Sequence, residues 1–435
     1  MKLNKWTLGL AAVGVVSLNS VTQAEEAQHA LMTAVQSTTL SGYVDTSAIW
    51  LAGPTSEAYS RNFFNTYGPV MYSPDGTAAN ASQYAPQGVM GRSFDGDDKQ
   101  NGFNLNVVDL TLEKPLDEGQ WSAGYKASLW LGPDANTLGS QSTLSTGSSD
   151  FAVRNAYVSL RAPVGNGLDF KFGVWDTIIG YEVMDSPYNP NYSRAFSYYI
   201  QPFIHTGMLA SYQVNDVLAF QGGIAETGGA DNSINSRSGV AGVKTYLGSV
   251  SLTAPESMGW LEGATLYGAI ADIGVGTASP TRTTDTINMY GGLTMPLPME
   301  GWACGVAYDY RANGLFDGSY ENSVGAYMSW QASEKLTLNG RFEYATGSRG
   351  SSVYGTLGGA TLVTDANFGA WGVPGGTSSN VKMTGVTGTV DYKLWGPAIT
   401  RLEFRWDHAA NGQTMFQGLS RKNIYSLALN VIYQF

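Results

Sequence analysis

The feature that most constrains this chain of 435 residues is a series of segments in which apolar and polar side chains alternate strictly. A period of two places successive side chains on opposite faces of a β-strand. The contrast is greatest in residues 400–408, where Leu402, Phe404 and Trp406 share one face. The opposite face carries four charged residues: Arg401, Glu403, Arg405 and Asp407. Because a dry core would not accept four charges from one strand, we expect the apolar face to meet lipid and the charged face a wet interior.

Strand length and the placement of aromatic residues favour a membrane barrel over a soluble β-sandwich, which would alternate in the same way. The segments run about 10 residues, the length of a tilted membrane strand, whereas soluble strands typically run about 5 or 6. Their apolar faces carry Tyr, Trp or Phe near the ends, as interfacial girdles require. The last segment ends with Tyr433 and Phe435 on its apolar face. This is an outer-membrane signature, and we expect the assembly machinery to contact the C-terminal strand.

Connections between the segments alternate between tight turns and long polar stretches, the asymmetry of porin-type barrels. They divide the chain into sixteen predicted strands, with fourteen to eighteen as the acceptable range: 40–50, 103–114, 120–131, 151–162, 167–176, 205–214, 217–226, 240–254, 264–273, 285–295, 302–311, 320–332, 335–346, 381–394, 398–409 and 422–435. Within 103–112 the apolar residues change parity, which indicates a β-bulge. A barrel of roughly sixteen strands encloses a lumen too wide for side chains to fill. We therefore predict an all-β, antiparallel, up-and-down transmembrane β-barrel with a water-filled, porin-like lumen.

The N-terminal residues and the composition agree with export to an outer membrane. Lys2 and Lys5 precede a short apolar run and small residues, so we predict a signal peptide over 1–24. Residues 25–39 would form a periplasmic lead-in, either a short helix or an unstructured stretch, and residues 40–435 the barrel. Only 14% of all residues are charged and 12% are aromatic, which suits strands with one face in lipid.

Charge, cysteine content and missing motifs argue against several classes of protein. Without Lys2 and Lys5 the chain has 24 − 2 = 22 basic and 35 acidic residues, a net charge of −13, which argues against a nucleic-acid partner. Cys304 is the only cysteine, so no intramolecular disulfide can form, and we expect it to face lipid. The chain has no Gly-x-Ser-x-Gly, His-Glu-x-x-His or Walker A motif, so we expect no enzyme and no cofactor. Three aspartates within 95–98 could bind Ca²⁺, but a solvated acidic loop is the default and we predict no metal site.

Six short motifs occur in a fixed order along the chain. They are Ser-Gly-Tyr-Val-Asp-Thr at 41–46, Leu-Thr-Leu-Glu-Lys-Pro-Leu at 110–116, Arg-Ala-Pro-Val at 161–164, Ile-Gly-Tyr-Glu-Val at 179–183, Asn-Pro-Asn-Tyr-Ser-Arg at 189–194 and His-Thr-Gly at 205–207. Together they resemble the outer-membrane β-barrel porins of the OmpL-like family, over nearly all of the chain after the predicted signal peptide. The resemblance implies passive diffusion of small hydrophilic solutes and ions.

Charged side chains on the predicted inner faces are the candidate determinants of selectivity. In the better registers nine acidic and eight basic residues face inward, which predicts weak charge selectivity. The pore-lining candidates are Asp45, Lys126, Asp169, Lys171, Arg341, Glu343, Arg401, Glu403, Arg405 and Asp407. The last six form a charge ladder across the strands 335–346 and 398–409. The ladder either tunes ion preference or neutralises itself and only keeps the wall rigid.

The connection 176–204 follows the fifth predicted strand, where sixteen-stranded porins, by fold analogy, fold a loop into the barrel. Its candidate constriction residues are Tyr181, Glu182, Asp185, Tyr192 and Arg194. An ordinary surface loop is the alternative, since long loops in compact folds are usually functional or disordered.

Three functional classes stay open. The first is a porin, the second a structural or surface-binding barrel whose long loops contact partners or glycans, and the third an outer-membrane hydrolase with His205 as its candidate histidine. The expected partners are outer-membrane lipid and small hydrophilic solutes. A homotrimer is compatible with the sequence, because the lipid face of a barrel and a trimer interface are both apolar.

Overall fold

The computed structural model describes ten stretches of the chain, and every structural statement below concerns these residues. They are 37–52, 102–117, 119–138, 150–226, 234–235, 242–274, 283–314, 317–348, 381–410 and 422–435. The predicted signal peptide 1–24, most of the predicted lead-in 25–39 and the aspartates within 95–98 lie outside them.

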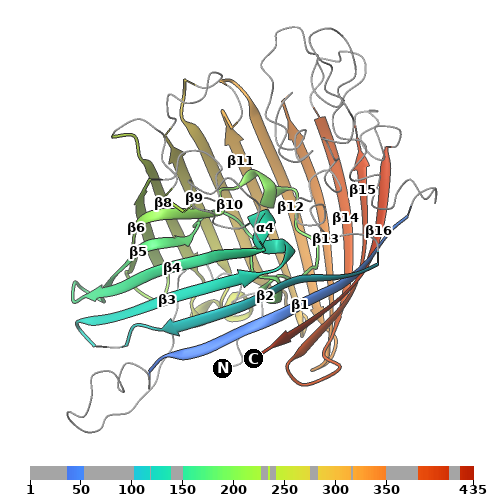
Figure 1. The fold of residues 1–435 in the computed structure, drawn as a ribbon, viewed down its shortest axis with the longest axis horizontal. Helices are drawn as coiled ribbons and strands as arrows, with labels where there is room; N and C mark the ends of the chain where they lie inside the picture. The colour runs from blue at the N-terminus through green and yellow to red at the C-terminus, as the bar shows by residue number, and fades with distance from the viewer. Residues whose placement is uncertain are drawn as a thin grey trace.

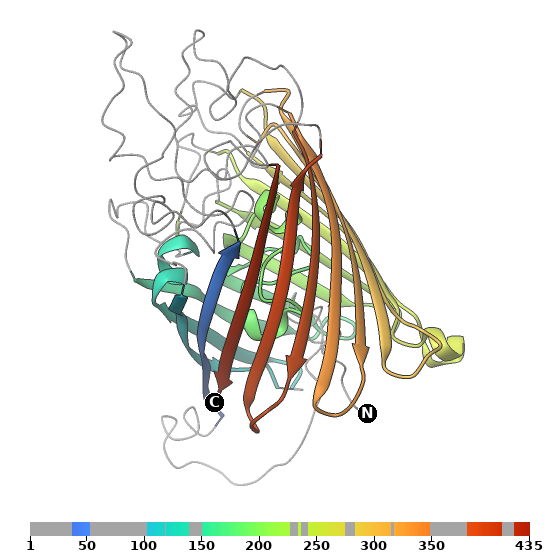
Figure 2. The ribbon, with the colours of Figure 1, turned by 90° about the vertical axis from the view of Figure 1, so that its right-hand side faces the viewer.

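Within the described residues, sixteen antiparallel strands form one closed barrel (Figure 1, Figure 2). The strands are β1 (Thr39–Ala52), β2 (Gly102–Lys114), β3 (Ser122–Leu131), β4 (Phe151–Ala162), β5 (Leu168–Asp176), β6 (Ile204–Gln213), β7 (Leu218–Ala225), β8 (Thr245–Thr253), β9 (Thr265–Ile273), β10 (Thr286–Pro296), β11 (Trp302–Ala312), β12 (Tyr320–Gln331), β13 (Leu336–Gly347), β14 (Val381–Tyr392), β15 (Ala398–Ala409) and β16 (Asn423–Gln434). Each pairs with its neighbours in sequence, and β16 pairs with β1. The predicted fold class, strand number and up-and-down topology are confirmed.

The seam between β1 and β16 closes the barrel. Gly42 and Phe435 exchange two backbone hydrogen bonds of 3.0 Å. Asp45 Oδ1 accepts hydrogen bonds from Asn430 Nδ2 (2.5 Å) and Asn106 Nδ2 (2.8 Å), so this carboxylate joins β1 to both of its neighbours. Asp45, a predicted pore-lining residue, therefore lies buried at the seam.

Side-chain exposure follows the predicted alternation. On β15, Leu402 and Phe404 are 47% and 48% exposed, whereas Arg401 and Arg405 are at most 1% exposed. An outer face of exposed apolar side chains fits the expected contact with lipid, which offers no water to solvate charges. Cys304 lies on the outer parity of β11 and is partly exposed, as expected from the sequence.

Two bulges interrupt the ladders. The pairing of β1 with β2 shifts register and leaves Asn106 as the extra residue, which confirms the bulge predicted within 103–112. The pairing of β3 with β4 shifts in the same way and leaves Arg154 as the extra residue. The second bulge turns the Arg154 side chain to the inside, where it is 3% exposed.

The two rims of the barrel differ, as the alternating connections predicted. One rim has short turns, and only the turn from β8 to β9 carries a short 3₁₀ helix, η6 (Glu256–Leu261).

The predicted strand 240–254 begins later than expected, at Thr245, because Gly242 has a φ of 90° and forms a turn. No helix in the described part of the chain is both long and apolar enough to cross a membrane.

The connection from β5 to β6 folds back into the barrel, so of the two alternatives for 176–204 the structure has the inward one (Figure 1). We call residues 177–203 the inner segment. It contains two 3₁₀ helices, η4 (Ser186–Tyr188) and η5 (Ser197–Ile200). Every residue from 191 to 202 is buried. The helix α4 (Pro133–Leu138) contributes Ala135 to a buried apolar cluster shared with η5. The core of the molecule thus lies inside the barrel.

Candidate functional site

The inner segment leaves and rejoins the wall at one narrow neck. Thr177 N donates a hydrogen bond to Phe203 O (3.0 Å), and the Thr177 hydroxyl lies 3.1 Å from His205 Nε2. His205 is buried, and its ring centroid lies 5.1 Å from that of Trp175. The two ends of the segment are therefore fixed side by side at the ends of β5 and β6.

Arg341 on β13 is the central anchor of the inner segment. Its guanidinium donates to Ser193 O (2.6 Å) and Arg194 O (3.3 Å). It also donates to one carboxylate of the segment, Glu182 (2.8 Å), and to one of the wall, Glu343 (2.9 Å). The planar fork of donors of an arginine suits such simultaneous contacts, which a lysine could not reproduce. Arg341 thus joins the segment to the wall through fully buried bonds.

Two arginines of β15 extend the contact along the segment. Arg401 donates to Ser186 O (3.0 Å) and Asn189 O (2.8 Å), which are backbone carbonyls of η4 and the residue after it. Arg405 donates to Arg194 O (2.5 Å). Buried carbonyl groups need a partner, and here the wall supplies it.

Carboxylates between these arginines bind the backbone N–H groups of the same stretch. Glu403 accepts from Tyr192 N (2.6 Å) and Ser193 N (3.0 Å). Glu343 accepts from Phe196 N (2.6 Å). Hydrogen bonds to an ionised group are roughly twice as strong as neutral ones. The ladder of β13 and β15 therefore pairs with both the donors and the acceptors of the inner segment.

Uncharged contacts hold the segment to β9 and β12. The Tyr267 hydroxyl donates to Ile178 O (2.9 Å). Tyr181 stacks on Tyr327, with ring centroids 4.1 Å apart and an interplanar angle of 19°. The buried apolar cluster around these contacts includes Trp175, Ile178, Ile179, Leu209, Leu247, Tyr267 and Tyr290.

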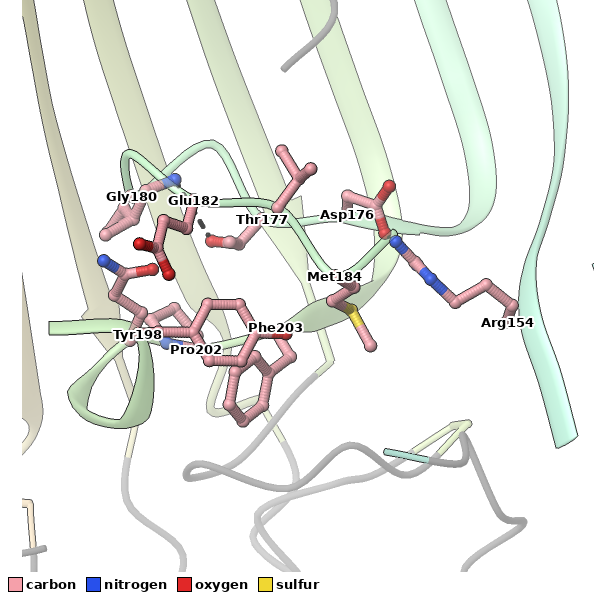
Figure 3. A pocket seen from close by; sticks show the side chains of 12 residues that line it. Arg154, Asp176, Thr177, Gly180, Glu182, Met184, Tyr198, Pro202 and Phe203 are labelled. Atoms are coloured by element: carbon pink, nitrogen blue, oxygen red, sulfur yellow. Dashed lines mark hydrogen bonds and ion pairs between the residues drawn. The ribbon is translucent and has the colours of Figure 1, made fainter. Parts of the chain in front are cut away.

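The opposite side of the inner segment faces β1 to β5 and keeps some exposure. Asp185 binds Arg154 (3.0 Å) and accepts a hydrogen bond from the Tyr43 hydroxyl (3.2 Å). Arg154 also pairs with Asp176, where the segment begins (Figure 3). Tyr188, at the end of η4, is 42% exposed. This side of the segment therefore retains solvent-exposed groups.

A small cavity lies within the fold of the inner segment (Figure 3). Its volume is about 30 Å³, room for roughly one or two water molecules. Arg154, Glu182 and Gln201 are among its polar lining residues. A solute larger than water must therefore pass elsewhere. In the part of the chain that the structure describes, no group of three or more His, Cys, Asp or Glu side chains is placed to hold a metal ion.

Comparison with known proteins identifies the family. The sequence profile described as "Putative beta-barrel porin-2, OmpL-like" matches residues 37–435. The chain belongs to this family. It is an outer-membrane porin, which agrees with the resemblance seen in the sequence motifs. No curated protein matches this porin.

Solved structures share the fold of this porin at low sequence identity. OmpF of Salmonella typhi, in a complex with daunomycin, is 11% identical, with 92% of this chain and 97% of that chain covered and a TM-score of 0.53. The outer membrane channel DcaP of Acinetobacter baumannii is 11% identical, with 92% and 97% covered and a TM-score of 0.51. OmpT, an outer membrane protein of Vibrio cholerae folded in vitro and solved in a trimer form, is 14% identical, with 92% and 99% covered and a TM-score of 0.51. At these identities the similarity concerns the fold alone.

The structure gathers six of the ten predicted pore-lining residues beneath the inner segment. They are Arg341, Glu343, Arg401, Glu403, Arg405 and Asp407, each at most 2% exposed. Asp407 binds Arg405 (2.7 Å), and the other five contact the segment directly. In this porin the ladder is thus occupied by protein groups and does not face open water.

Three of the remaining candidates stay partly exposed on the wall of β3 to β5. Each has one close partner: Glu113 for Lys126 (3.9 Å), Arg161 for Asp169 (2.6 Å) and the Tyr157 ring for Lys171 (5.0 Å to the ring centroid). The tenth candidate, Asp45, lies at the seam described above.

Four of the five candidates in the inner segment bind the wall, and the fifth, Arg194, holds the segment together internally. Tyr181 stacks on the wall, Glu182 accepts from Arg341 and Asp185 binds Arg154. The Tyr192 hydroxyl donates to Ser47 of β1 (3.0 Å), and Arg194 donates to Met184 O within the segment (2.6 Å). Of the five, Tyr181 and Asp185 keep partial exposure.

Arg154 is one of the site residues that sequence reasoning missed, together with Tyr267 and Tyr327. Strict alternation from Arg161 places residue 154 on the lipid face, whereas the bulge in β4 turns it inward. A signal was present, because the exposed apolar residues of this strand change parity from Phe151 to Val158 and Leu160. The same change of parity revealed the bulge in β2.

Proposed function

We propose that solutes cross this porin by passive diffusion through the part of the lumen bounded by β2 to β9 and the free side of the inner segment. The observation that carries this proposal is the binding of the segment to β13 and β15 by three buried arginines, on a half of the wall, β10 to β15, whose inner-facing residues are nearly all buried. On the other half, the inner-facing Lys126, Asp169 and Ser249 stay partly exposed. A wall of charged and hydroxyl side chains suits small hydrophilic solutes and ions.

Ion conductance tests the channel itself. Purified protein refolded into a planar bilayer should give stepwise currents, and vesicles containing it should swell in isotonic glucose. Neither readout should need a conformational trigger, because the inner segment is held in place by bonds that the structure already contains. A barrel that inserts but passes neither ions nor glucose would contradict the proposal.

We propose no chemical reaction for this porin. A hydrolase would cleave phospholipid or peptide substrates when refolded, and a purely structural barrel would bind partners without conducting. Conductance together with unchanged phospholipid after prolonged incubation supports a channel. The absence of a reaction would be contradicted if the wild-type protein cleaved phospholipid and the His205→Ala substitution abolished that cleavage.

We infer that the porin assembles as a homotrimer. The similarity of its fold to the trimer form of OmpT supports this assembly. The exposed apolar face of β2 to β4, which includes Leu112, Leu131 and Val158, could serve a neighbouring copy as well as lipid. Chemical cross-linking in native membranes should give a covalent trimer. A protein that stays monomeric after cross-linking would contradict the inference.

We also propose that residues 1–24 are removed on export. N-terminal sequencing of the protein from outer membranes should begin at Glu25. A mature chain that still begins at Met1 would contradict this.

A further inference from the structure

The cations on the inner face of the barrel strands that the structure describes have carboxylate partners, with one exception. On the open wall, these pairs are Arg154 with Asp176, Arg161 with Asp169 (2.6 Å) and Lys126 with Glu113 (3.9 Å). The arginines of β13 and β15 are buried beneath the inner segment. None of these guanidinium or ammonium groups is free to bind a passing anion without losing a bond.

Lys171 on β5 is the exception. Among the described residues, no carboxylate lies within 4 Å of its ammonium group, which instead lies 5.0 Å from the centroid of the Tyr157 ring. A cation above an aromatic face is attracted by the ring without using its N–H donors on an acceptor. The donors of Lys171 therefore stay available on the partly exposed inner face of the wall.

The surroundings of Lys171 place it beside the open path. Asp176, Lys126, Glu113 and Asp169 are the charged groups close enough to act on it electrostatically. The carboxylates among them already have the partners named above, so their charges are largely compensated. Asp109 and Glu113 of β2 also act electrostatically on Tyr188 of the inner segment.

We propose that Lys171 is a contact site for anionic solutes, small carboxylates in particular, as they cross the pore. This rests on the channel function proposed above. The carboxylate of a passing solute accepts hydrogen bonds from the Lys171 ammonium. Tyr157 is a positioning residue, since its ring fixes where that ammonium lies. The contact raises the local concentration of anions relative to cations and so shifts the selectivity of the pore.

The test is the reversal potential across a planar bilayer in a potassium acetate gradient. Lys171→Gln should lower the acetate to potassium permeability ratio by about two- to fivefold, the range expected for one partly solvated charge contact. Lys171→Arg should retain the wild-type ratio. Lys335→Gln removes the same charge from the exposed turn between β12 and β13 and should leave the ratio unchanged.

A second variant separates selectivity from folding. In a Cys304→Ala background, Lys171→Cys can be modified by thiol reagents that add either a positive or a negative group. The positive adduct should restore the acetate preference and the negative one should lower it further, within one folded protein. Conducting channels whose permeability ratio is the same for both adducts would overturn the role of Lys171. A wild-type barrel that does not conduct would overturn the channel function itself, which is a different result.

Discussion

At the scale of single residues, three buried arginines each bind a backbone carbonyl of the inner segment and a carboxylate of the wall. The wall partners are Glu343 for Arg341 (2.9 Å), Asp391 for Arg401 (3.4 Å) and Asp407 for Arg405 (2.7 Å). A buried ion pair by itself is weak evidence for stability, because desolvation offsets the attraction between its charges. The loss of one partner is costly, however, since it leaves a buried charge uncompensated.

Arg341→Gln should therefore lower the free energy of unfolding by about 3–5 kcal/mol, because Glu182 and Glu343 would lose their shared cation. Urea unfolding of the protein in lipid vesicles measures this change. Lys393→Gln, at an exposed turn, is the matched control and should change the same quantity by less than about 0.5 kcal/mol. Equal effects of the two variants would show that the guanidinium does not anchor the segment.

A carboxylate outside the strands gives a prediction on pH. Asp317, between β11 and β12, accepts hydrogen bonds from the backbone N–H groups and hydroxyls of Thr283 and Thr284, and these donors hold its pKa well below its usual range. A depressed folded pKa stabilises this contact above the unfolded pKa, and that stabilisation is lost as the pH falls through the folded value. The amide of Thr283 should stay protected from hydrogen exchange at pH 4, and Asp317→Asn should reduce that protection. Equal protection in both proteins would contradict this contact.

At the scale of elements, the strands follow from the sequence and the bulges only in part. Alternation predicted sixteen strands and placed the ladder of β13 and β15 on the inner face, because a period of two reports which face a side chain occupies. Alternation did not identify Arg154 as an inner residue, because one extra residue in β4 reverses the faces of the residues before it. What covers an inner face is set by contacts distant in sequence. The bond from Arg401 to Ser186 O spans 215 residues and has no local signal.

The contact of the inner segment with β11 depends on a glycine of that strand. A Cβ at Gly305 would overlap the hydroxyl of Tyr181, so Gly305→Ala should displace the ring from its stack on Tyr327. We expect a loss of about 1–3 kcal/mol in the free energy of unfolding, as for other overpacked sites. Gly340→Ala on the outer face is the control, because its Cβ would meet no atom within 4 Å. The prediction is wrong if Gly305→Ala is tolerated as well as Gly340→Ala.

At the scale of the whole molecule, the barrel is asymmetric inside. The inner-facing residues of β10 to β15 are nearly all buried beneath the inner segment, and the apolar cluster beside the segment extends from β5 to β12. Polar residues of β3 to β8, such as Lys126, Asp169 and Ser249, keep partial exposure. The sequence predicted a wet lumen and weak selectivity from nearly equal numbers of inward acids and bases. That count treats the ladder as solvated, whereas the structure shows it bound to the segment. The charged side chains that can interact with solutes in the lumen are therefore fewer than the charged side chains that point inward.

The central claim, that the water-filled path runs along β2 to β9, is tested most directly by blocking the pore from one wall or the other. In a Cys304→Ala background, Ser249→Cys on β8 and Ser329→Cys on β12 place single thiols on opposite inner walls, the first partly exposed and the second buried. A bulky charged thiol reagent should reduce the single-channel conductance of the Ser249 variant by at least half, and leave that of the Ser329 variant unchanged. Block of the Ser329 variant with none of the Ser249 variant would contradict the account.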